Sequence, residues 1–254
     1  MGKVIAIANQ KGGVGKTTTT INLGACMAHL GKKVLILDMD PQGNTTSGLG
    51  IDRDKLDSTI YDVLIGQASL KNAIYMTDMD GLFISPSGQQ LVGAEVELVE
   101  EDEREFRLHN ALNEVSADFD FIFIDCPPSL GLITINSLVA AQTVLIPIQC
   151  EYYALEGLSY LTNTIRQIRK VLNTTLDIEG VLLTMYDSRT NLSIQVVEEV
   201  KRCFPQKVYK TVIPRNVRLS EAPSYGQPII MYDPSSKGAK CYLQLAEELL
   251  ENNK

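Results

Sequence analysis

A glycine-rich segment near the N-terminus constrains the fold of this chain more than any other feature. Lys11-Gly12-Gly13-Val14-Gly15-Lys16-Thr17 follows an apolar run at residues 4–8 and precedes a helical pattern at residues 17–30. A strand, a glycine turn and a helix N-terminus in this order aim backbone N–H groups at one point, where they can bind phosphate oxygens. The alternative is a chance turn before a helix, and the carboxylates described below argue against it.

The residue types in this segment fit a nucleoside triphosphate. Gly12, Gly13 and Gly15 are expected to take positive φ and to let the backbone approach the phosphates closely. Lys16 is expected to neutralise the β and γ phosphates, and the Thr17 hydroxyl to ligate Mg²⁺. The segment is therefore predicted to bind and hydrolyse ATP.

This loop departs from the common pattern G-x-x-x-x-G-K-[ST], whose first glycine would fall on Gln10. In its place the loop offers Lys11, one residue further on. Because Lys16 already serves the phosphates, a second lysine is hard to explain within one subunit. We expect Lys11 to act across a dimer interface.

The rest of the chain alternates short apolar runs with amphipathic stretches. Strands are predicted at residues 4–8, 34–37, 82–85, 121–124, 144–148 and 180–183, and helices at 17–30, 105–115, 155–172, 194–203 and 239–250. Strands that are apolar on both faces predict an α/β fold with a mostly parallel, twisted sheet covered by helices on both sides. Ligands of such sheets bind at the carboxyl ends of the strands.

The composition is that of an ordinary globular protein, with 44% hydrophobic and 21% charged residues over 254 positions. Without an obvious linker, residues 1–254 are expected to form a single domain. The five cysteines are scattered and never spaced C-x-x-C, which disfavours a disulfide framework or a zinc site. Neither a signal peptide nor a membrane-spanning run is evident, so we expect a cytoplasmic protein without a membrane partner.

The charge of the chain is unevenly distributed. The formal net charge of −8 by itself disfavours nucleic-acid binding, which lysine and arginine drive by replacing counterions. Residues 95–105 hold seven acids against one arginine, whereas residues 201–240 hold eight basic residues against two acids. Each window is equally typical of a solvated surface.

Carboxylates follow two of the predicted strands. Asp38 and Asp40 come after residues 34–37, and strand alternation is expected to point both to the same side. We expect Asp40 to activate the attacking water and Asp38 to join the metal shell, with turn-forming acids before a proline as the alternative. Asp125 ends the run 121–124 and is expected to serve Mg²⁺. Cys126, which follows it, is expected to be a packed thiol.

At this point the chain resembles the Soj/ParA family of deviant Walker-type ATPases, which segregate bacterial chromosomes and plasmids. The resemblance covers nearly the whole chain and is carried by residues 11–18, 38–44, 125–131, 149–157 and 212–218. It implies a P-loop NTPase fold and a cycle driven by ATP and Mg²⁺. The ATP-bound homodimer binds double-stranded DNA without sequence preference, on the nucleoid, and a ParB/Spo0J-like partner stimulates hydrolysis.

The same resemblance implies roles for individual residues. Lys11 reaches the phosphates of the other subunit, and Gly12 lies at the dimer interface. The nucleotide is bound by the loop from Lys11 through Thr18, including Val14, and on the adenine side by Pro214, Arg215 and Asn216. Arg189 and Arg218 fall where the family contacts DNA, and Lys201, Lys237 and Lys240 are added as further candidates. Tyr152 and Tyr153 are expected to be packing and interface residues.

Three alternatives remain. A MinD-like membrane ATPase shares the loop, but it needs a basic amphipathic C-terminal helix, and residues 245–254 are acidic. An iron–sulfur carrier related to nitrogenase reductase needs paired cysteines at a dimer axis. A nucleotide-dependent scaffold without turnover would share the motifs and differ only in lacking hydrolysis.

Overall fold

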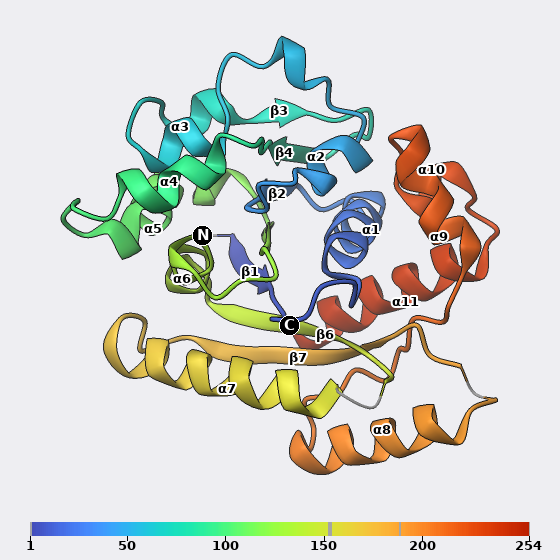
Figure 1. Ribbon diagram of the computed structural model, residues 1–254. Helices are drawn as coiled ribbons and strands as arrows, with labels where there is room; N and C mark the ends of the chain where they lie inside the picture. Colours follow the sequence, from blue (N-terminus) through green and yellow to red (C-terminus); the bar gives the residue numbers. More distant parts are fainter. Residues whose placement is uncertain (1, 152–153, 188, 254) are drawn as a thin grey trace.

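The computed structural model describes residues 2–151, 154–187 and 189–253 (Figure 1). Within them, seven strands form one sheet in the order β3-β4-β2-β5-β1-β6-β7. The strands are β1 (Lys3–Ile7), β2 (Val34–Asp38), β3 (Tyr75–Met76), β4 (Leu82–Ser85), β5 (Phe121–Asp125), β6 (Thr143–Gln149) and β7 (Asp177–Thr184). Only β3 runs antiparallel to its neighbour, which confirms the predicted, mostly parallel sheet.

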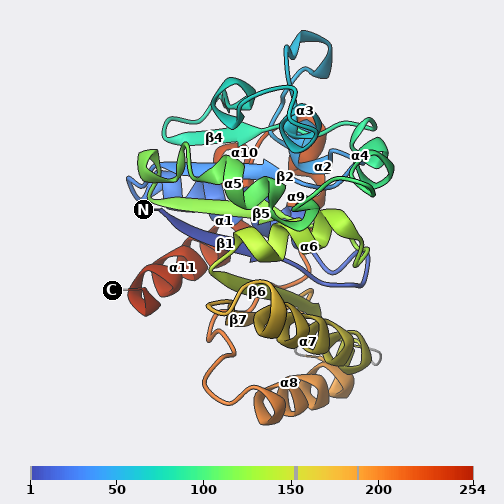
Figure 2. The same ribbon diagram turned by 90° about the vertical axis from the view of Figure 1, so that its left-hand side faces the viewer.

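Helices lie on both faces of this sheet (Figures 1 and 2). The α-helices are α1 (Lys16–His29), α2 (Asn44–Gly48), α3 (Ile60–Leu64), α4 (Leu91–Glu97), α5 (Arg107–Leu112), α6 (Leu132–Ala140), α7 (Ala154–Val171), α8 (Asn191–Cys203), α9 (Val217–Glu221), α10 (Ile229–Tyr232) and α11 (Lys237–Asn252). Short 3₁₀ turns are η1 (Arg53–Lys55), η2 (Leu70–Ala73), η3 (Arg104–Phe106), η4 (Ser116–Asp118) and η5 (Ala222–Tyr225).

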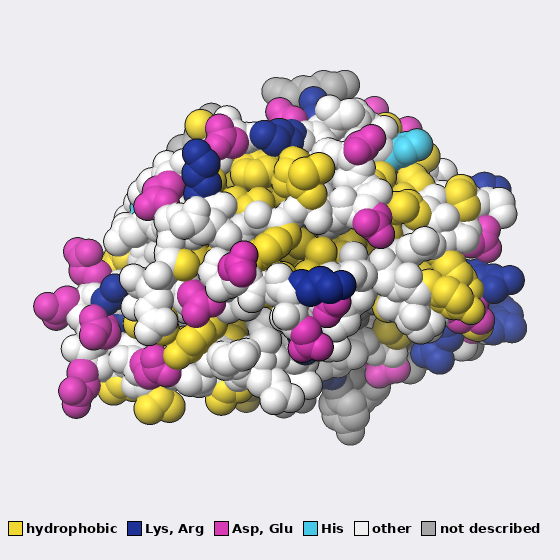
Figure 3. Space-filling view, turned by 90° about the horizontal axis from the view of Figure 1, so that it is seen from above, with side chains coloured by type: hydrophobic (Ala, Val, Ile, Leu, Met, Phe, Trp, Pro, Cys, Tyr) yellow, Lys and Arg dark blue, Asp and Glu magenta, His cyan; other side chains and the backbone are white. Residues whose placement is uncertain are grey.

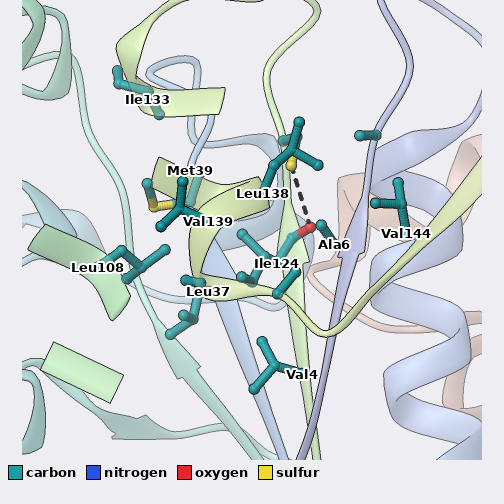
Figure 4. Close-up of a cluster of buried hydrophobic side chains, with 14 of the residues drawn as sticks. Val4, Ala6, Leu37, Met39, Leu108, Ile124, Ile133, Leu138, Val139 and Val144 are labelled. Carbon is teal, nitrogen blue, oxygen red and sulfur yellow. Dashed lines mark hydrogen bonds between the residues drawn. The ribbon is translucent and has the colours of Figure 1, made fainter. Parts of the chain in front are cut away.

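Alternate residues of the strands supply two separate hydrophobic cores. Val4 and Ile124 belong to the core that α3 to α8 cover, whereas Ile5 and Phe123 belong to the core under α1, α10 and α11. Because the strands are apolar on both faces, neither face is left to solvent. Figure 4 shows part of the first core, where Leu138 and other α6 side chains lie over β1, β2 and β5.

The apolar side of helix α11 is buried inside the molecule. Tyr242, Leu245, Ala246 and Leu249 are buried in the core that α11 shares with α1. A helix whose apolar face is covered by its own core has no such face to insert into a lipid surface. None of the helices in the described part of the chain is long and apolar enough to span a membrane.

The sequence missed or misplaced several short elements. The helix expected at residues 105–115 is divided into η3 and the six-residue α5. Helix α6 was not predicted, because its sequence is apolar on nearly all sides and shows no clear helical stripe. The two-residue edge strand β3 is too short to give a periodic signal.

Candidate nucleotide-binding site

The glycine-rich loop joins the carboxyl end of β1 to the N-terminus of α1, as the sequence predicted. Gly13 (φ 74°) and Gly15 (φ 91°) take the left-handed conformation that favours glycine. Gly12 was expected to do the same and does not; no atom lies within 4 Å of the position that a methyl group on Gly12 would take. The turn therefore needs glycine at two of the three positions, and Gly12 borders open space.

Two hydrogen bonds fix the course of the loop. The Lys16 ammonium donates to the Lys11 carbonyl at 3.0 Å, and the Thr184 hydroxyl of β7 donates to the Val14 carbonyl at 2.8 Å. Burial lowers the pKa of Lys16, and the negative charge of Asp125 opposes this shift. Lys16 is thus a largely buried cation at the N-terminus of α1, where phosphate oxygens would be bound.

Asp125 lies at the end of β5 within reach of three threonine hydroxyls. Thr17 and Thr45 donate to its Oδ2 at 2.8 and 2.7 Å, and Thr20 donates to its Oδ1 at 3.2 Å. Burial raises the pKa of Asp125, while the hydroxyls and the nearby Lys16 charge lower it. This arrangement fits Mg²⁺, because a carboxylate behind Thr17 orients the hydroxyl oxygen that would ligate the ion.

A Mg²⁺ ion bound here would need further ligands from phosphate oxygens. Over the described residues, no group of three His, Cys, Asp or Glu side chains could hold a metal by itself. Mg²⁺ in nucleotide sites is typically held by few protein ligands together with phosphates and water. The donor set around Thr17 and Asp125 fits such a site.

The two aspartates after β2 have different surroundings. The strand ends at Asp38, so strand alternation does not extend to Asp40, and the expectation that both point to one side lacks its basis. Asp38 is fully buried and accepts hydrogen bonds from the Thr46 hydroxyl (2.7 Å), the Thr46 backbone (2.8 Å) and the Asp40 backbone (3.2 Å). Asp40 instead lines the cavity beside the glycine loop. The metal role of Asp38 stays a prediction.

Two adjoining cavities lie at this edge of the sheet. One, of about 370 Å³, is lined by Lys16, Thr17 and Asp40 and suits phosphates. The other, of about 580 Å³, is lined by Pro214, Arg215, Asn216 and neighbouring apolar residues. Gly15, Thr18 and Met185 line both cavities. A base at residues 214–216 and its phosphates at the loop would therefore occupy neighbouring cavities that share these three residues.

Lys11 and Gly12 both line a small third cavity, and Gly12 also lines the phosphate cavity. A methyl group placed on Gly157 of α7 would lie 3.4 Å from Cγ of Lys11, so the lysine stem runs along this helix. The Lys11 backbone N–H donates to the Asn9 side chain at 3.0 Å. The role of both residues at a dimer interface stays a prediction.

Comparison with known proteins supports the same assignment. A protein-family model described as an AAA domain matches residues 2–178. The sporulation initiation inhibitor protein Soj of Bacillus subtilis is 62% identical over 252 residues, covering 99% of this chain and 100% of that protein. The chain belongs to the Soj/ParA family of chromosome-partitioning ATPases. The chromosome partitioning protein ParA of Myxococcus xanthus is also similar, at 54% identity over 100% of this chain and 89% of that protein.

Solved structures share the fold of this Soj/ParA chain. The cell division ATPase MinD of Pyrococcus furiosus is 31% identical with a TM-score of 0.82, covering 99% of each chain. A cobyrinic acid a,c-diamide synthase from Mycobacterium smegmatis, solved with ADP and magnesium, is 39% identical with a TM-score of 0.87. That match covers 99% of this chain and 95% of the synthase. The P-loop NTPase fold predicted from the sequence is confirmed.

The residues predicted to contact DNA do not form one cluster. Arg189 and Lys237 line a common cavity, together with Lys210 and Arg215. Arg218 lies on α9, where it pairs with Glu221 at 2.8 Å and is 3.6 Å from Asp233. Lys240 lies on α11, whereas Lys201 lies on α8, which is at the bottom of the molecule in Figures 1 and 2 and apart from α9. Their roles stay predictions.

Acidic and basic side chains are separated on the face seen in Figure 3. Asp and Glu gather at its left end, on the side of α4 and α5, and Lys and Arg gather at the right end. The sequence itself also separates acidic residues, at 95–105, from basic residues, at 201–240. A net negative protein can therefore still present a local basic surface.

Several residues of the site were not singled out from the sequence. Thr20, Thr45 and Thr184 support Asp125 and the loop through hydroxyl groups, and threonines at these positions give no motif of their own. Met185 takes a positive φ of 51°, which is unusual for a side chain of its size and marks the wall between the two cavities.

The remaining expectations concern Cys126 and two tyrosines. Cys126 is buried, its Sγ lies 3.8 Å from the Ile124 carbonyl (dashed line in Figure 4), and burial raises the pKa of its thiol to about 12. It is a packed thiol, as predicted. Tyr152 and Tyr153 lie outside the described residues.

Proposed function

We propose that this chain is a single P-loop ATPase domain that dimerises when it binds ATP and Mg²⁺. The ATP dimer binds double-stranded DNA on the nucleoid without sequence preference, and a ParB/Spo0J-like partner stimulates hydrolysis and release. The observation that carries the proposal is a loop with two lysines, of which Lys16 alone has the buried position of the phosphate-binding lysine. Lys11 lines a smaller neighbouring cavity, and Gly12 lines both that cavity and the phosphate cavity, so we infer that a second subunit shares the nucleotide on this side.

The geometry also supports a role for each group in hydrolysis. Lys16 and the backbone N–H groups at the start of α1 neutralise and hold the phosphates, and Thr17 with Asp125 would hold Mg²⁺. The ion would offset charge on the phosphate oxygens. Asp40, with its carboxylate at the phosphate cavity, orients the attacking water.

Basal hydrolysis is expected to be slow. The described residues that line the phosphate cavity include Lys16 but no arginine. An arginine supplied by another molecule typically accelerates hydrolysis in P-loop enzymes by roughly 10³- to 10⁵-fold. A stimulating partner thus fits the composition of the site.

Gly12 allows a direct test of the dimerisation step. It has no positive φ, and among the described residues beyond its chain neighbours no atom lies within 4 Å of a methyl group added to it. A valine at this position is therefore compatible with the folded monomer. Gly12→Val should retain the stability of the wild type and lose ATP-induced dimerisation, measured by light scattering with ATP or ADP.

The decisive experiment measures binding to duplex DNA with ATP, ADP or no nucleotide over a salt series, using wild type, Gly12→Val and Arg218→Glu. We expect tight binding by wild type with ATP only, and weak binding by both variants. Equal binding under all nucleotide conditions would rule out the switch. Full affinity and an unchanged salt slope for Arg218→Glu would show that the DNA surface is assigned wrongly.

Turnover separates this function from a nucleotide-dependent scaffold. Asp40→Ala should bind ATP and form the dimer but release phosphate at least about 100-fold more slowly than wild type. A wild-type chain that dimerises with ATP and releases no phosphate, even with its partner present, would favour the scaffold.

A further inference from the structure

A basic cavity separate from the phosphate cavity lies at the second edge of residues 214–215. It measures about 600 Å³ and is bordered by the segment after β7, the segment before α9 and the first turns of α11. Arg189, Lys210, Arg215 and Lys237 line it, and Asp187 is the one acid among the described lining residues. Four cations from separate segments favour an anionic ligand.

Asp187 holds the Arg189 guanidinium as a phosphate would. Arg189 donates from Nε to Oδ1 at 2.9 Å and from Nη2 to Oδ2 at 2.6 Å, and its backbone N–H donates to Oδ1 at 3.0 Å. These bonds, together with the charge of Arg215, hold the pKa of Asp187 well below its usual range. The Arg189 guanidinium therefore holds this carboxylate in the bidentate geometry that arginine also uses with phosphate.

Backbone contacts hold the segments that carry Lys210 and Arg215. The Glu248 carboxylate of α11 accepts the backbone N–H groups of Lys210 at 2.7 Å and Thr211 at 3.0 Å. Residues 213 and 186 are joined by a backbone hydrogen bond of 3.1 Å, next to the bridge between Tyr186 and Pro214. The cavity is thus a built feature of the sheet edge.

The same wall borders the nucleotide. Pro214 and Arg215 line both this cavity and the larger cavity of the nucleotide site. A base bound against residues 214–216 would press on the opposite side of the segment that carries Arg215. The two cavities therefore share part of one wall.

We propose that this cavity binds a phosphate of the DNA backbone, with Lys210 and Arg215 as ligands beside Arg189, and that Asp187 is an internal competitor for Arg189. The proposal rests on the DNA binding proposed above. DNA displaces the carboxylate from the guanidinium, so the competitor lowers affinity in every state and helps to keep the nucleotide-free protein off DNA.

The first test changes the competitor. Asp187→Asn should tighten binding of the ATP-loaded protein to a duplex by about two- to fivefold, the range that an exposed ion pair spans. Asp52→Asn is the matched control, because Asp52 also forms a solvent-accessible ion pair, with Lys55, and the charge change is identical. If the two substitutions have equal effects, Asp187 acts only through the net charge of the protein, and its role as a competitor is overturned.

A double-mutant cycle isolates the contact. If Asp187 acts through Arg189, Asp187→Asn in an Arg189→Gln background should have only the small effect of Asp52→Asn. Full tightening in that background would contradict the proposal. Thermal unfolding of each variant checks that the fold is retained.

The second test changes the ligands. Lys210 lines the basic cavity and neither cavity of the nucleotide site. Lys210→Gln should therefore weaken DNA binding about three- to tenfold and lower the salt slope by about one, with ATP binding unchanged. Lys207→Gln is its control, since Lys207 pairs with Asp177 and does not line the cavity. Arg215→Gln should weaken DNA binding at saturating ATP as well.

The outcomes separate this inference from the function on which it rests. If wild type binds no DNA in any nucleotide state, the proposed function fails. If wild type binds DNA with ATP and the Lys210, Arg215 and Asp187 variants match it, the function stands and this cavity is not part of the DNA surface.

Discussion

The hydroxyl of Thr17 donates a 2.8 Å hydrogen bond to Oδ2 of Asp125, joining the first turn of α1 to the end of β5 across 108 residues of sequence. This bond orients the threonine oxygen toward the phosphate cavity. It brings together two residues that were each assigned from a separate motif. The consequences for metal binding are direct.

Asp125→Asn should lower the affinity for Mg²⁺ roughly 10- to 100-fold, because an amide holds the Thr17 hydroxyl less strongly than a carboxylate does. A Mg²⁺ titration of ATP hydrolysis gives the shift in the half-saturating concentration. Thr17→Ser keeps the hydroxyl and serves as the control, with a near-normal titration expected. An unchanged Mg²⁺ dependence in Asp125→Asn would remove this residue from the metal site.

Thr46→Val should destabilise the protein by about 1–3 kcal/mol, since it removes a hydroxyl that donates to buried Asp38 and accepts from the Ser87 backbone at 2.9 Å. Urea unfolding measures the loss, and Thr46→Ser should cost less than about 1 kcal/mol.

The cost of Thr46→Val should also depend on pH. Burial, followed by repulsion from Asp125, raises the pKa of Asp38 to about 7. Because the pKa of Asp38 is raised in the folded state, its contribution to the free energy of unfolding is present at low pH. This contribution is lost as the pH rises through the folded-state pKa. The lost hydroxyl matters most to the ionised carboxylate, so the variant should lose more stability near pH 8 than near pH 5. An equal loss at both pH values would contradict the assignment.

A network around Glu179 holds residues near both ends of the described chain against the sheet. Glu179 of β7 pairs with Lys3 at 2.7 Å and accepts hydrogen bonds from Thr143 at 2.6 Å and Asn253 at 2.7 Å. Burial alone would raise the pKa of Glu179, but these bonds outweigh it and lower the pKa. The stabilisation is therefore present above the unfolded pKa and is lost as the pH falls through the lowered value.

Glu179→Gln should accordingly cost about 1–3 kcal/mol at neutral pH, and the difference from wild type should shrink in acid. Asp177→Asn on the same strand is the control, because the ion pairs of Asp177 are exposed and should be worth less than about 1 kcal/mol. If both variants lose a similar free energy of unfolding, burial of the Glu179 network does not add to the stability of the protein.

Gly226→Ala should be more destabilising than Gly66→Ala, although both glycines have positive φ, at 64° and 80°. At Gly66 no atom lies within 4 Å of the added methyl, so only the backbone penalty of about 1–2 kcal/mol applies. At Gly226 the methyl would lie 2.7 Å from Cα of Gly50, a backbone atom that must shift. Chemical denaturation compares the two, and equal losses would show that the close approach is not required.

The sequence alone determined the sheet class, the glycine loop and the carboxylate at the end of β5. These features are local: a periodic apolar pattern, a glycine turn or an acid after a strand can be recognised within about ten residues. The sequence also indicated a loop with two lysines, because Gln10 stands where the common pattern has its first glycine. Gly12 was assigned positive φ wrongly, because a glycine shows that left-handed backbone is allowed and not that it is used.

Only the tertiary structure decided which neighbouring groups share a site. Asp38 and Asp40 are two residues apart, yet one is enclosed by Thr46 and the other lines the phosphate cavity. Asp187, Lys210 and Lys237 are far apart in sequence and border one basic cavity. The physical reason is that packing of α2 and α11 against the sheet sets these distances, and such long-range contacts leave no periodic trace in the chain.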